Sequence, residues 1–176
     1  IFSEDGQFVC NISDTKKVEG EIYLHQLEKN EQKKITKGTK YVLSIDKERR
    51  EKIRNNHSAT HLLHQSLRKI LGEHVSQKGS LVSDQKLRFD FTYNKSLTNK
   101  QIYEIEMLVN KTIRLNLIQT EELATVREAI ENGAIALFGE KYPEKVRVIT
   151  FNSDDNNLLV SKELCGGTHV NATGQI

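Results

Sequence analysis

Residues 55–72, NNHSATHLLHQSLRKILG, are the stretch around which the chain is organised. Apolar side chains recur in it at steps of three and four residues, which predicts an amphipathic helix, and Gly72 stands where a left-handed cap would end that helix. His57 and His61 are spaced i and i+4. This spacing places both imidazoles on one face of the helix, one turn apart, where they can reach a single metal ion.

A second pair of metal-binding residue types, Cys165 and His169, lies in the stretch LCGGTH at residues 164–169. Gly166 and Gly167 allow the backbone between them to curl, so that the thiol and the imidazole can converge. Three imidazoles and one thiolate form a nitrogen and sulfur set that prefers Zn²⁺ over hard cations. Each pair alone is weak evidence, but the two together predict a zinc site between the histidine helix and this loop.

The kind of zinc site stays open at the level of the sequence. A zinc peptidase needs a glutamate directly after the first histidine of an HExxH pattern, and here Ser58 follows His57, so that class is excluded. Four protein ligands usually close a structural site, whereas a catalytic zinc keeps one position open for water. His64 could approach the same helix face, but a fifth ligand is not needed, and we assign no metal role to His64 or His74.

Composition indicates a soluble intracellular domain. The chain has 176 residues, 36% of them hydrophobic and 28% charged, and a formal net charge of +2, so bulk charge does not predict a polyanionic partner. No segment reads as a membrane span or a secretory signal, and we expect a cytoplasmic location. We interpret the two cysteines as reduced, with Cys10 in the core and Cys165 as a ligand. The chain opens on Ile1 and has one methionine, Met107, which suggests a piece of a longer protein.

The pattern of elements predicts an α+β fold. We expect a small β-rich lobe over residues 1–46 and a core over residues 47–176 that carries the zinc site. The core combines an antiparallel or mixed sheet with helices, because strands and helices mix without a βαβ rhythm. The expected strands are residues 8–12, 21–25, 41–46, 86–93, 117–123, 146–151 and 158–161, with Gly79 at a turn or bulge. Further helices are expected from Thr98, with Gln101 completing a capping box, and over residues 125–132.

The charged stretch KERREKIR at residues 47–54 allows two interpretations. It is either a solvated helix face on which Glu48 and Lys52 form an i, i+4 ion pair, or a basic approach to the metal site for a phosphate-bearing substrate. Charge alone favours the first interpretation, and the position of the stretch just before the histidines strengthens the second.

Several motifs together resemble the editing domain of alanyl-tRNA synthetase. They are RNNHSATHLLH at residues 54–64, SQKGS at 76–80, LRFDF at 87–91, ALFGEKY at 136–142 and LCGGTHV at 164–170. The resemblance runs in order from about residue 14 to the end of the chain. Free-standing alanyl editing proteins and the threonyl-tRNA synthetase editing domain share the ligand pattern, but the CGGTH and ALFGEKY motifs are similar to the alanyl branch.

The resemblance implies hydrolysis of the ester that joins serine or glycine, as the wrong amino acid, to tRNA(Ala), with zinc as cofactor. It implies that His57, His61, Cys165 and His169 are the zinc ligands and that His57, Cys165 and Gln77 take part in the chemistry. The implied substrate pocket is formed by Gln77, Ser80, Arg88, Asp90, Gly166 and Gly167. The implied partners are mischarged tRNA(Ala) and the rest of the synthetase chain, with ATP bound by the full-length enzyme, and no membrane is involved.

Three alternatives to this function are kept. The chain could be a free-standing deacylase, a zinc-stabilised RNA-binding module without activity, or a hydrolase of some other acyl ester. A strand-face ion pair is an equally good explanation for Arg88 and Asp90, as a turn hydroxyl is for Ser80. No carboxylate stands at a spacing that identifies a general base, so Glu163 and Asp90 are the residues to test.

Overall fold

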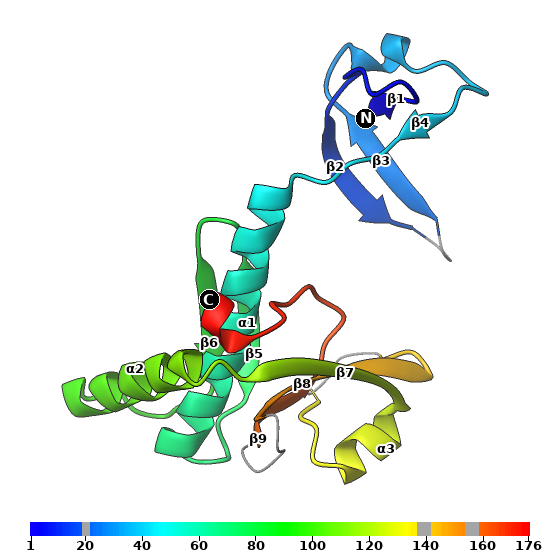
Figure 1. Ribbon diagram of the computed structural model, residues 1–176. Helices are drawn as coiled ribbons and strands as arrows, with labels where there is room; N and C mark the ends of the chain where they lie inside the picture. Colours follow the sequence, from blue (N-terminus) through cyan, green and yellow to red (C-terminus); the bar gives the residue numbers. More distant parts are fainter. Residues whose placement is uncertain (19–21, 137–141, 154–158) are drawn as a thin grey trace. The chain divides into compact units, whose positions relative to one another are not determined.

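The computed structural model describes residues 1–18, 22–136, 142–153 and 159–176, and its elements are drawn in Figure 1. The chain divides into two compact units, Ile1–Asp46 and Lys47–Ile176. Small antiparallel sheets and helices are mixed along the chain, so the predicted α+β class is confirmed. No helix in the part of the chain that the structure describes has the length and apolar character needed to cross a membrane.

The first unit consists of two small antiparallel ribbons. β1 (Phe2–Ser3) pairs with β4 (Tyr41–Val42), and β2 (Ile12–Lys17) pairs with β3 (Tyr23–Leu27). A short 3-10 helix, η1 (Glu31–Lys34), lies between β3 and β4 in the sequence. This unit supplies none of the residues predicted to bind metal.

The strand predicted at residues 8–12 is wrong, because Phe8 forms only an isolated bridge and β2 begins at Ile12. β2 is polar and exposed over nearly all of its length. Backbone pairing with β3, rather than an apolar pattern, defines this strand, so the apolar run before it led to the wrong prediction. Cys10 in that run is fully buried, as predicted.

The second unit is organised around α1 (Lys47–Leu71), which confirms the predicted histidine helix and extends it back through the charged stretch. The helix ends before Gly72, whose φ of +119° lies in the left-handed region that favours glycine. α1 packs against α2, β5, β6 and β9. Two of its leucines are buried in different hydrophobic clusters, Leu62 with Phe151 of β8 and Leu67 with Ile105 of α2.

A hairpin and a second helix cover one flank of α1. β5 (Gln77–Val82) pairs with β6 (Leu87–Phe91), and the register shifts between Gln77 and Gly79, which confirms the irregularity predicted there. Phe89 and Phe91 pack into the cluster around Leu67 and Val75, as their alternation predicts.

α2 (Asn99–Arg114) begins as the sequence predicts. The Thr98 side chain accepts a hydrogen bond from the Gln101 backbone, and the Gln101 side chain returns one to Thr98, so the capping box is confirmed. α2 lies beside α1 in Figure 1.

A three-stranded antiparallel sheet in the order β7-β8-β9 carries the second pair of predicted ligands. Its strands are β7 (Ile118–Thr125), β8 (Lys145–Asn152) and β9 (Leu159–Leu164). α3 (Val126–Glu131) follows β7 directly and packs on β7 and β8. Because β9 packs against α1 and ends at Leu164, the residues that follow it emerge beside the histidine helix.

The end of the chain is fixed by a buried hydroxyl in η2 (Thr173–Gln175). Thr173 is fully buried; its Oγ1 accepts from the Leu117 backbone N–H at 2.8 Å and donates to the Thr112 carbonyl at 2.9 Å. These bonds tie the end of the chain to α2 and to the start of β7, so the loop after β9 is anchored at both of its ends.

Candidate metal centre

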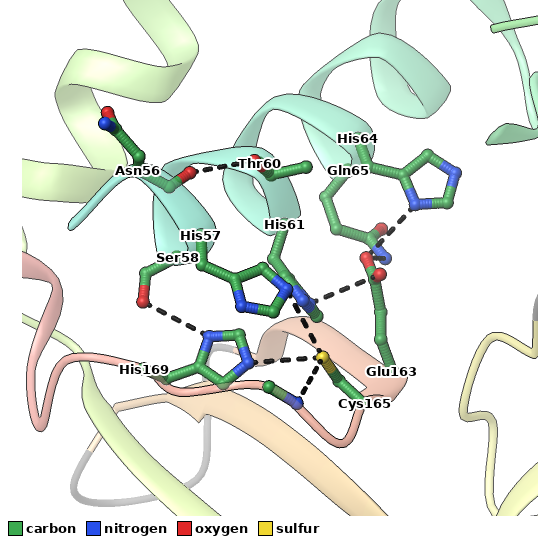
Figure 2. A network of polar contacts seen from close by, with 11 residues as sticks. Asn56, His57, Ser58, Thr60, His61, His64, Gln65, Glu163, Cys165 and His169 are labelled. Carbon is green, nitrogen blue, oxygen red and sulfur yellow. Dashed lines mark hydrogen bonds and ion pairs between the residues drawn. The ribbon is translucent and has the colours of Figure 1, made fainter. Parts of the chain in front are cut away.

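Two elements converge to form one cluster of potential metal ligands. α1 supplies His57 and His61, and the loop after β9 supplies Cys165 and His169. One nitrogen or sulfur atom from each residue lies within 4.8 Å of the others. Figure 2 shows the two helix imidazoles facing the Cys165 sulfur and the His169 ring.

The spacing of the donor atoms fits a tetrahedral metal ion. Cys165 Sγ lies 3.5 Å from His57 Nε2 and 3.3 Å from His169 Nε2. Zinc with ordinary Zn–S and Zn–N bonds and tetrahedral angles would set sulfur and nitrogen ligands about 3.6 Å apart. These two pairs of atoms already have about the separation that a zinc ion sets, and the nitrogen and sulfur donors of the group are of the type that zinc prefers.

Burial makes the two sides of the cluster unequal. His61 and His169 are buried, with 5% and 9% of their surface exposed, whereas His57 and Cys165 are partly exposed. The first two imidazoles thus form a fixed inner side. Among the described residues, the exposed side of the cluster is that of His57 and Cys165, from which a small molecule can approach.

Burial also keeps the imidazoles neutral, as a metal ligand must be. Burial, with a smaller effect from the charge of His61, lowers the pKa of His57 to about 4. Burial and the neighbouring imidazoles lower the pKa of His169 to about 2, and burial lowers the pKa of His61 as well. Burial raises the pKa of the Cys165 thiol, so in the absence of a cation this residue carries its proton, which metal binding would release.

The loop that carries Cys165 and His169 is held by side chains from β8 and α1. Arg147 of β8 donates from Nε to the Cys165 carbonyl at 3.1 Å and from a terminal nitrogen to the Gly167 carbonyl, and it pairs with Glu121 at 3.4 Å. Arg54 of α1 donates to the Thr168 hydroxyl at 3.1 Å. The position of the two ligands therefore depends on both elements.

Ser58 provides a further tie between α1 and the loop. Its hydroxyl is fully buried, accepts from the Val170 backbone N–H at 3.1 Å, and lies 3.3 Å from His169 Nδ1. Because Nδ1 of His169 faces Ser58, Nε2 of the same ring faces the cluster (Figure 2).

The two glycines of the loop differ in their surroundings. A Cβ atom added at Gly167 would overlap the His57 ring, whereas one added at Gly166 would have nothing within 4 Å. Gly167 is therefore required for the close approach of the loop to α1. Both glycines lie next to Cys165, where the sequence predicted part of a substrate pocket.

Glu163 lies behind the cluster rather than in it. Its side chain is 7% exposed; Oε2 is 3.3 Å from His61 Nδ1, and Oε1 is 3.2 Å from His64 Nδ1. The contact with His61 has the distance of an ion pair without the angle of a hydrogen bond. Burial acts to raise the pKa of Glu163, but the neighbouring His61 and the hydrogen bonds with His64 and Gln65 outweigh it, so the pKa is lowered. His64 is not one of the four residues of the cluster.

The other predicted pocket residues lie on the β5–β6 hairpin. Gln77 opens β5 opposite Phe91, and Ser80 is exposed opposite Phe89. Arg88 and Asp90 form an ion pair with an N–O distance of 3.1 Å. No hydrogen bond or ion pair of the described residues joins Gln77, Ser80, Arg88 or Asp90 to the cluster, so their pocket role stays a prediction.

Two further sequence motifs remain, the charged stretch at residues 47–54, which the structure describes, and the motif at 136–142, most of which it does not. In the charged stretch, Glu48 and Lys52 form the predicted ion pair at 2.7 Å, while its use as a basic approach for substrate stays a prediction. Residues 137–141 of the motif at 136–142 lie outside the residues that the structure describes.

A cavity of about 470 Å³ lies away from the cluster, between α1, α2 and β9. Lys69, Lys111 and Lys162 are among its lining residues, and none of the four cluster residues lines it. The chemistry of the chain is therefore assigned from the converging donor atoms and not from this cavity.

Comparison with known proteins finds a synthetase-related segment that contains two of the four cluster residues, Cys165 and His169. Residues 146–176 match the family described as the second additional domain of threonyl and alanyl tRNA synthetases. This segment contains β8, β9 and the loop with Cys165 and His169. The class that the site indicates is therefore a domain associated with aminoacyl-tRNA synthetases.

Nearly the whole chain is similar to alanine–tRNA ligases. Over 94% of its own length, this chain is 49% identical to the alanine–tRNA ligase of Wolbachia pipientis wMel. Over 95% of its own length, it is 51% identical to the alanine–tRNA ligase of Sphingopyxis alaskensis. It is 46% identical to that of Parvibaculum lavamentivorans over 100% of its length. The chain covers 18%, 19% and 20% of these three relatives, about a fifth of their length. The resemblance to the editing domain of alanyl-tRNA synthetase is confirmed.

Sequence reasoning did not predict the residues that support the cluster. Arg147 is a charged residue within the apolar run of β8, and this contrast was a usable signal. Ser58 gave no signal, because a serine between two histidines of a helix is unremarkable without its tertiary partner. Glu163 was considered only as a base, since its position between two histidines of α1 depends on the sheet.

Proposed function

We propose that this chain is the editing segment of an alanine–tRNA ligase, which hydrolyses the aminoacyl ester of tRNA(Ala) mischarged with serine or glycine. The observation that carries the proposal is the convergence of three imidazoles and one thiol, with donor atoms within 4.8 Å of one another, in a chain similar to alanine–tRNA ligases. The proposed partners are tRNA(Ala) and the rest of the synthetase chain.

The proposed zinc ligands are His57, His61, Cys165 and His169. Zinc would supply Lewis acidity and a fixed point for orienting the ester. His61 and His169 form the buried inner side of the site, while His57 and Cys165 border the side that a substrate can reach. Arg147 ties the loop to β8, and Gly167 allows the loop to approach α1 closely.

A polar editing pocket explains why serine would be removed and alanine spared. Serine differs from alanine by one added hydroxyl, and an apolar pocket rejects such an isostere by only about a hundredfold. The site that attaches alanine to tRNA would therefore need a second site that removes serine. If buried polar groups in the editing pocket bind the serine hydroxyl, an alanyl ester leaves them unpaired at a cost of about 1–3 kcal/mol each. We propose Gln77 as one such group, with Ser80, Arg88 and Asp90 as weaker candidates.

The general base is not assigned to a carboxylate of the site. Glu163 is buried and both of its oxygens face histidines of α1, and Asp90 is paired with Arg88. We propose that the ribose hydroxyl of the substrate assists the attacking water. If Glu163→Gln, saturated with zinc, and Asp90→Asn both kept the full rate of deacylation, neither carboxylate would be the general base.

The test is deacylation of seryl-tRNA(Ala) and alanyl-tRNA(Ala), compared between the unchanged chain, Cys165→Ala and Cys10→Ala. We expect release of serine but not of alanine, abolished by Cys165→Ala and kept by Cys10→Ala. The second variant is the matched control, because Cys10 is a buried cysteine of the other unit. No release by folded, zinc-loaded protein would contradict the proposal.

A zinc-stabilised RNA-binding module is the second candidate, favoured by the four protein ligands, a number that usually closes a structural site. Chelation separates the two candidates. A structural zinc is expected to be lost together with the fold. Loss of activity with retained secondary structure would support the editing function.

A further inference from the structure

A buried carboxylate between two imidazoles lies directly behind the cluster. Glu163, on β9, is 6% exposed and faces α1, with one oxygen toward His61 and the other toward His64. The Gln65 side chain donates to Oε1 at 3.4 Å. Figure 2 shows the Glu163 carboxylate pointing toward His61 on one side and toward His64 and Gln65 on the other. Neither oxygen is free to contact a substrate on the open side of the cluster.

The carboxylate has no lysine or arginine partner among the described residues, since its ion pairs are with His61 and His64. An ionised carboxylate in a buried position is unfavourable unless a cation or several hydrogen bonds compensate it. A divalent metal ion bound by one thiolate retains one positive charge. Glu163 is close enough to the cluster to neutralise that charge through His61.

The geometry also determines which nitrogen of His61 can bind a metal. Nδ1 faces Glu163, so the other ring nitrogen, Nε2, faces the cluster. An imidazole that binds a metal through Nε2 carries its proton on Nδ1, and a carboxylate acceptor stabilises that tautomer. His169 has the same arrangement with the Ser58 hydroxyl at Nδ1.

Building on the zinc site proposed above, we propose that Glu163 is a positioning residue whose carboxylate holds His61 in the Nδ1-protonated tautomer and presents Nε2 to the metal. His64 and Gln65 keep the carboxylate in place from its other side. Glu163 acts through His61 and touches neither substrate nor metal. It is therefore a determinant of metal affinity rather than the general base.

The first test compares the zinc affinity of the unchanged chain, Glu163→Gln and Glu122→Gln by competition with a chromogenic chelator. Glu163→Gln keeps the size of the side chain but removes its charge, and we expect zinc affinity to fall by about 10- to 100-fold. Glu122→Gln is the matched control, because Glu122 is an exposed glutamate of the same sheet, paired with Lys162 at 3.2 Å. We expect its zinc affinity to stay within about twofold of the unchanged value.

The second test records the ring nitrogens of His61 by NMR in the zinc-loaded chain. We expect a slowly exchanging Nδ1–H and a metal-bound Nε2 in the unchanged chain, and loss of the slow exchange in Glu163→Gln. A merely structural role for Glu163 would not change this pattern. His61 bound through Nδ1 in the unchanged chain would overturn the inference even if the variant failed to fold.

Folded Glu163→Gln with unchanged zinc affinity and an unchanged His61 spectrum would also overturn the inference. These readouts do not depend on deacylation. A zinc-loaded chain with the expected His61 spectrum but no deacylation would contradict the proposed function and leave the role of Glu163 standing. A chain that deacylates but lacks that spectrum would support the proposed function and overturn the role of Glu163.

Discussion

Adjacent glycines in the loop after β9 have unequal roles at the scale of single residues. A methyl group at Gly167 would overlap the His57 ring, and one at Gly166 would meet open space. We expect Gly167→Ala to lower zinc affinity by at least about tenfold. The loop and the His57 ring must move apart to make room for the methyl group, and this displaces the ligands. Chelator competition measures this effect.

Gly166→Ala is the matched control for that substitution. Since nothing lies within 4 Å of the added methyl group, we expect zinc affinity to stay within about twofold of the unchanged value. Equal affinities of the two variants would mean that the loop adapts without disturbing the cluster.

The histidines of the metal-free cluster predict a pH dependence of stability. Burial lowers the pKa of His57 to about 4 and that of His169 to about 2, whereas both have an ordinary value of 6.5 in an unfolded chain. Below pH 6.5 the unfolded chain therefore binds more protons, and stability falls as pH falls toward 4. We expect the unfolding temperature of the metal-free chain to drop by roughly 5–10 °C between pH 7 and pH 5.

Thermal unfolding followed by circular dichroism measures this drop. The control is His25→Asn, which changes an exposed histidine of the first unit and is expected to show the same pH dependence. An unfolding temperature that is constant over this range would contradict the prediction.

The four cluster residues could be predicted from the sequence, and their supports could not. The spacing of His57 and His61 fixes their geometry because a helix has a known period. Their approach to Cys165, 108 positions from His57, follows from the order of strands in a sheet, which spacing does not determine. Arg147 and Glu163 act through that sheet order, so their contacts became visible only in the structure.

At the scale of elements, one serine joins α1 to the loop after β9. Ser58→Ala would leave the buried N–H of Val170 without its acceptor, and we expect a loss of about 1–3 kcal/mol in the free energy of unfolding. Thr60→Ala is the control, because the Thr60 hydroxyl donates to the Asn56 carbonyl of its own helix at 2.8 Å and to no other element among the described residues. Urea unfolding of both variants measures the difference, and equal losses would contradict the proposed tie.

Elements with strong local signals were predicted better than those without them. α1 and α2 carry an apolar period and defined ends, at Gly72 and at the Thr98 capping box, and the structure confirms both helices. β2 has neither an apolar face nor a buried surface, so its strand state depends on pairing with β3. A strand of this kind cannot be located by hydrophobic alternation.

At the scale of the whole molecule, the second unit contains everything described for the metal centre. The four ligand residues, Ser58, Glu163 and Arg147 all lie within Lys47–Ile176, as do the three hydrophobic clusters. We therefore expect a chain of residues 47–176 to fold and to bind zinc within about threefold of the affinity of residues 1–176. Circular dichroism and chelator competition measure this, and an unfolded or metal-free product would contradict it.

The distance along the chain between the two ligand pairs has a consequence for folding kinetics. His57 and Cys165 are separated by 108 positions, so the complete set of ligands exists only after β9 has docked on α1. Contacts between such distant residues form late, because loop closure must first be overcome. A metal ion bound to all four residues would act as a cross-link that forms after the folding barrier has been passed. Zinc is therefore expected to slow unfolding strongly while leaving the rate of refolding almost unchanged.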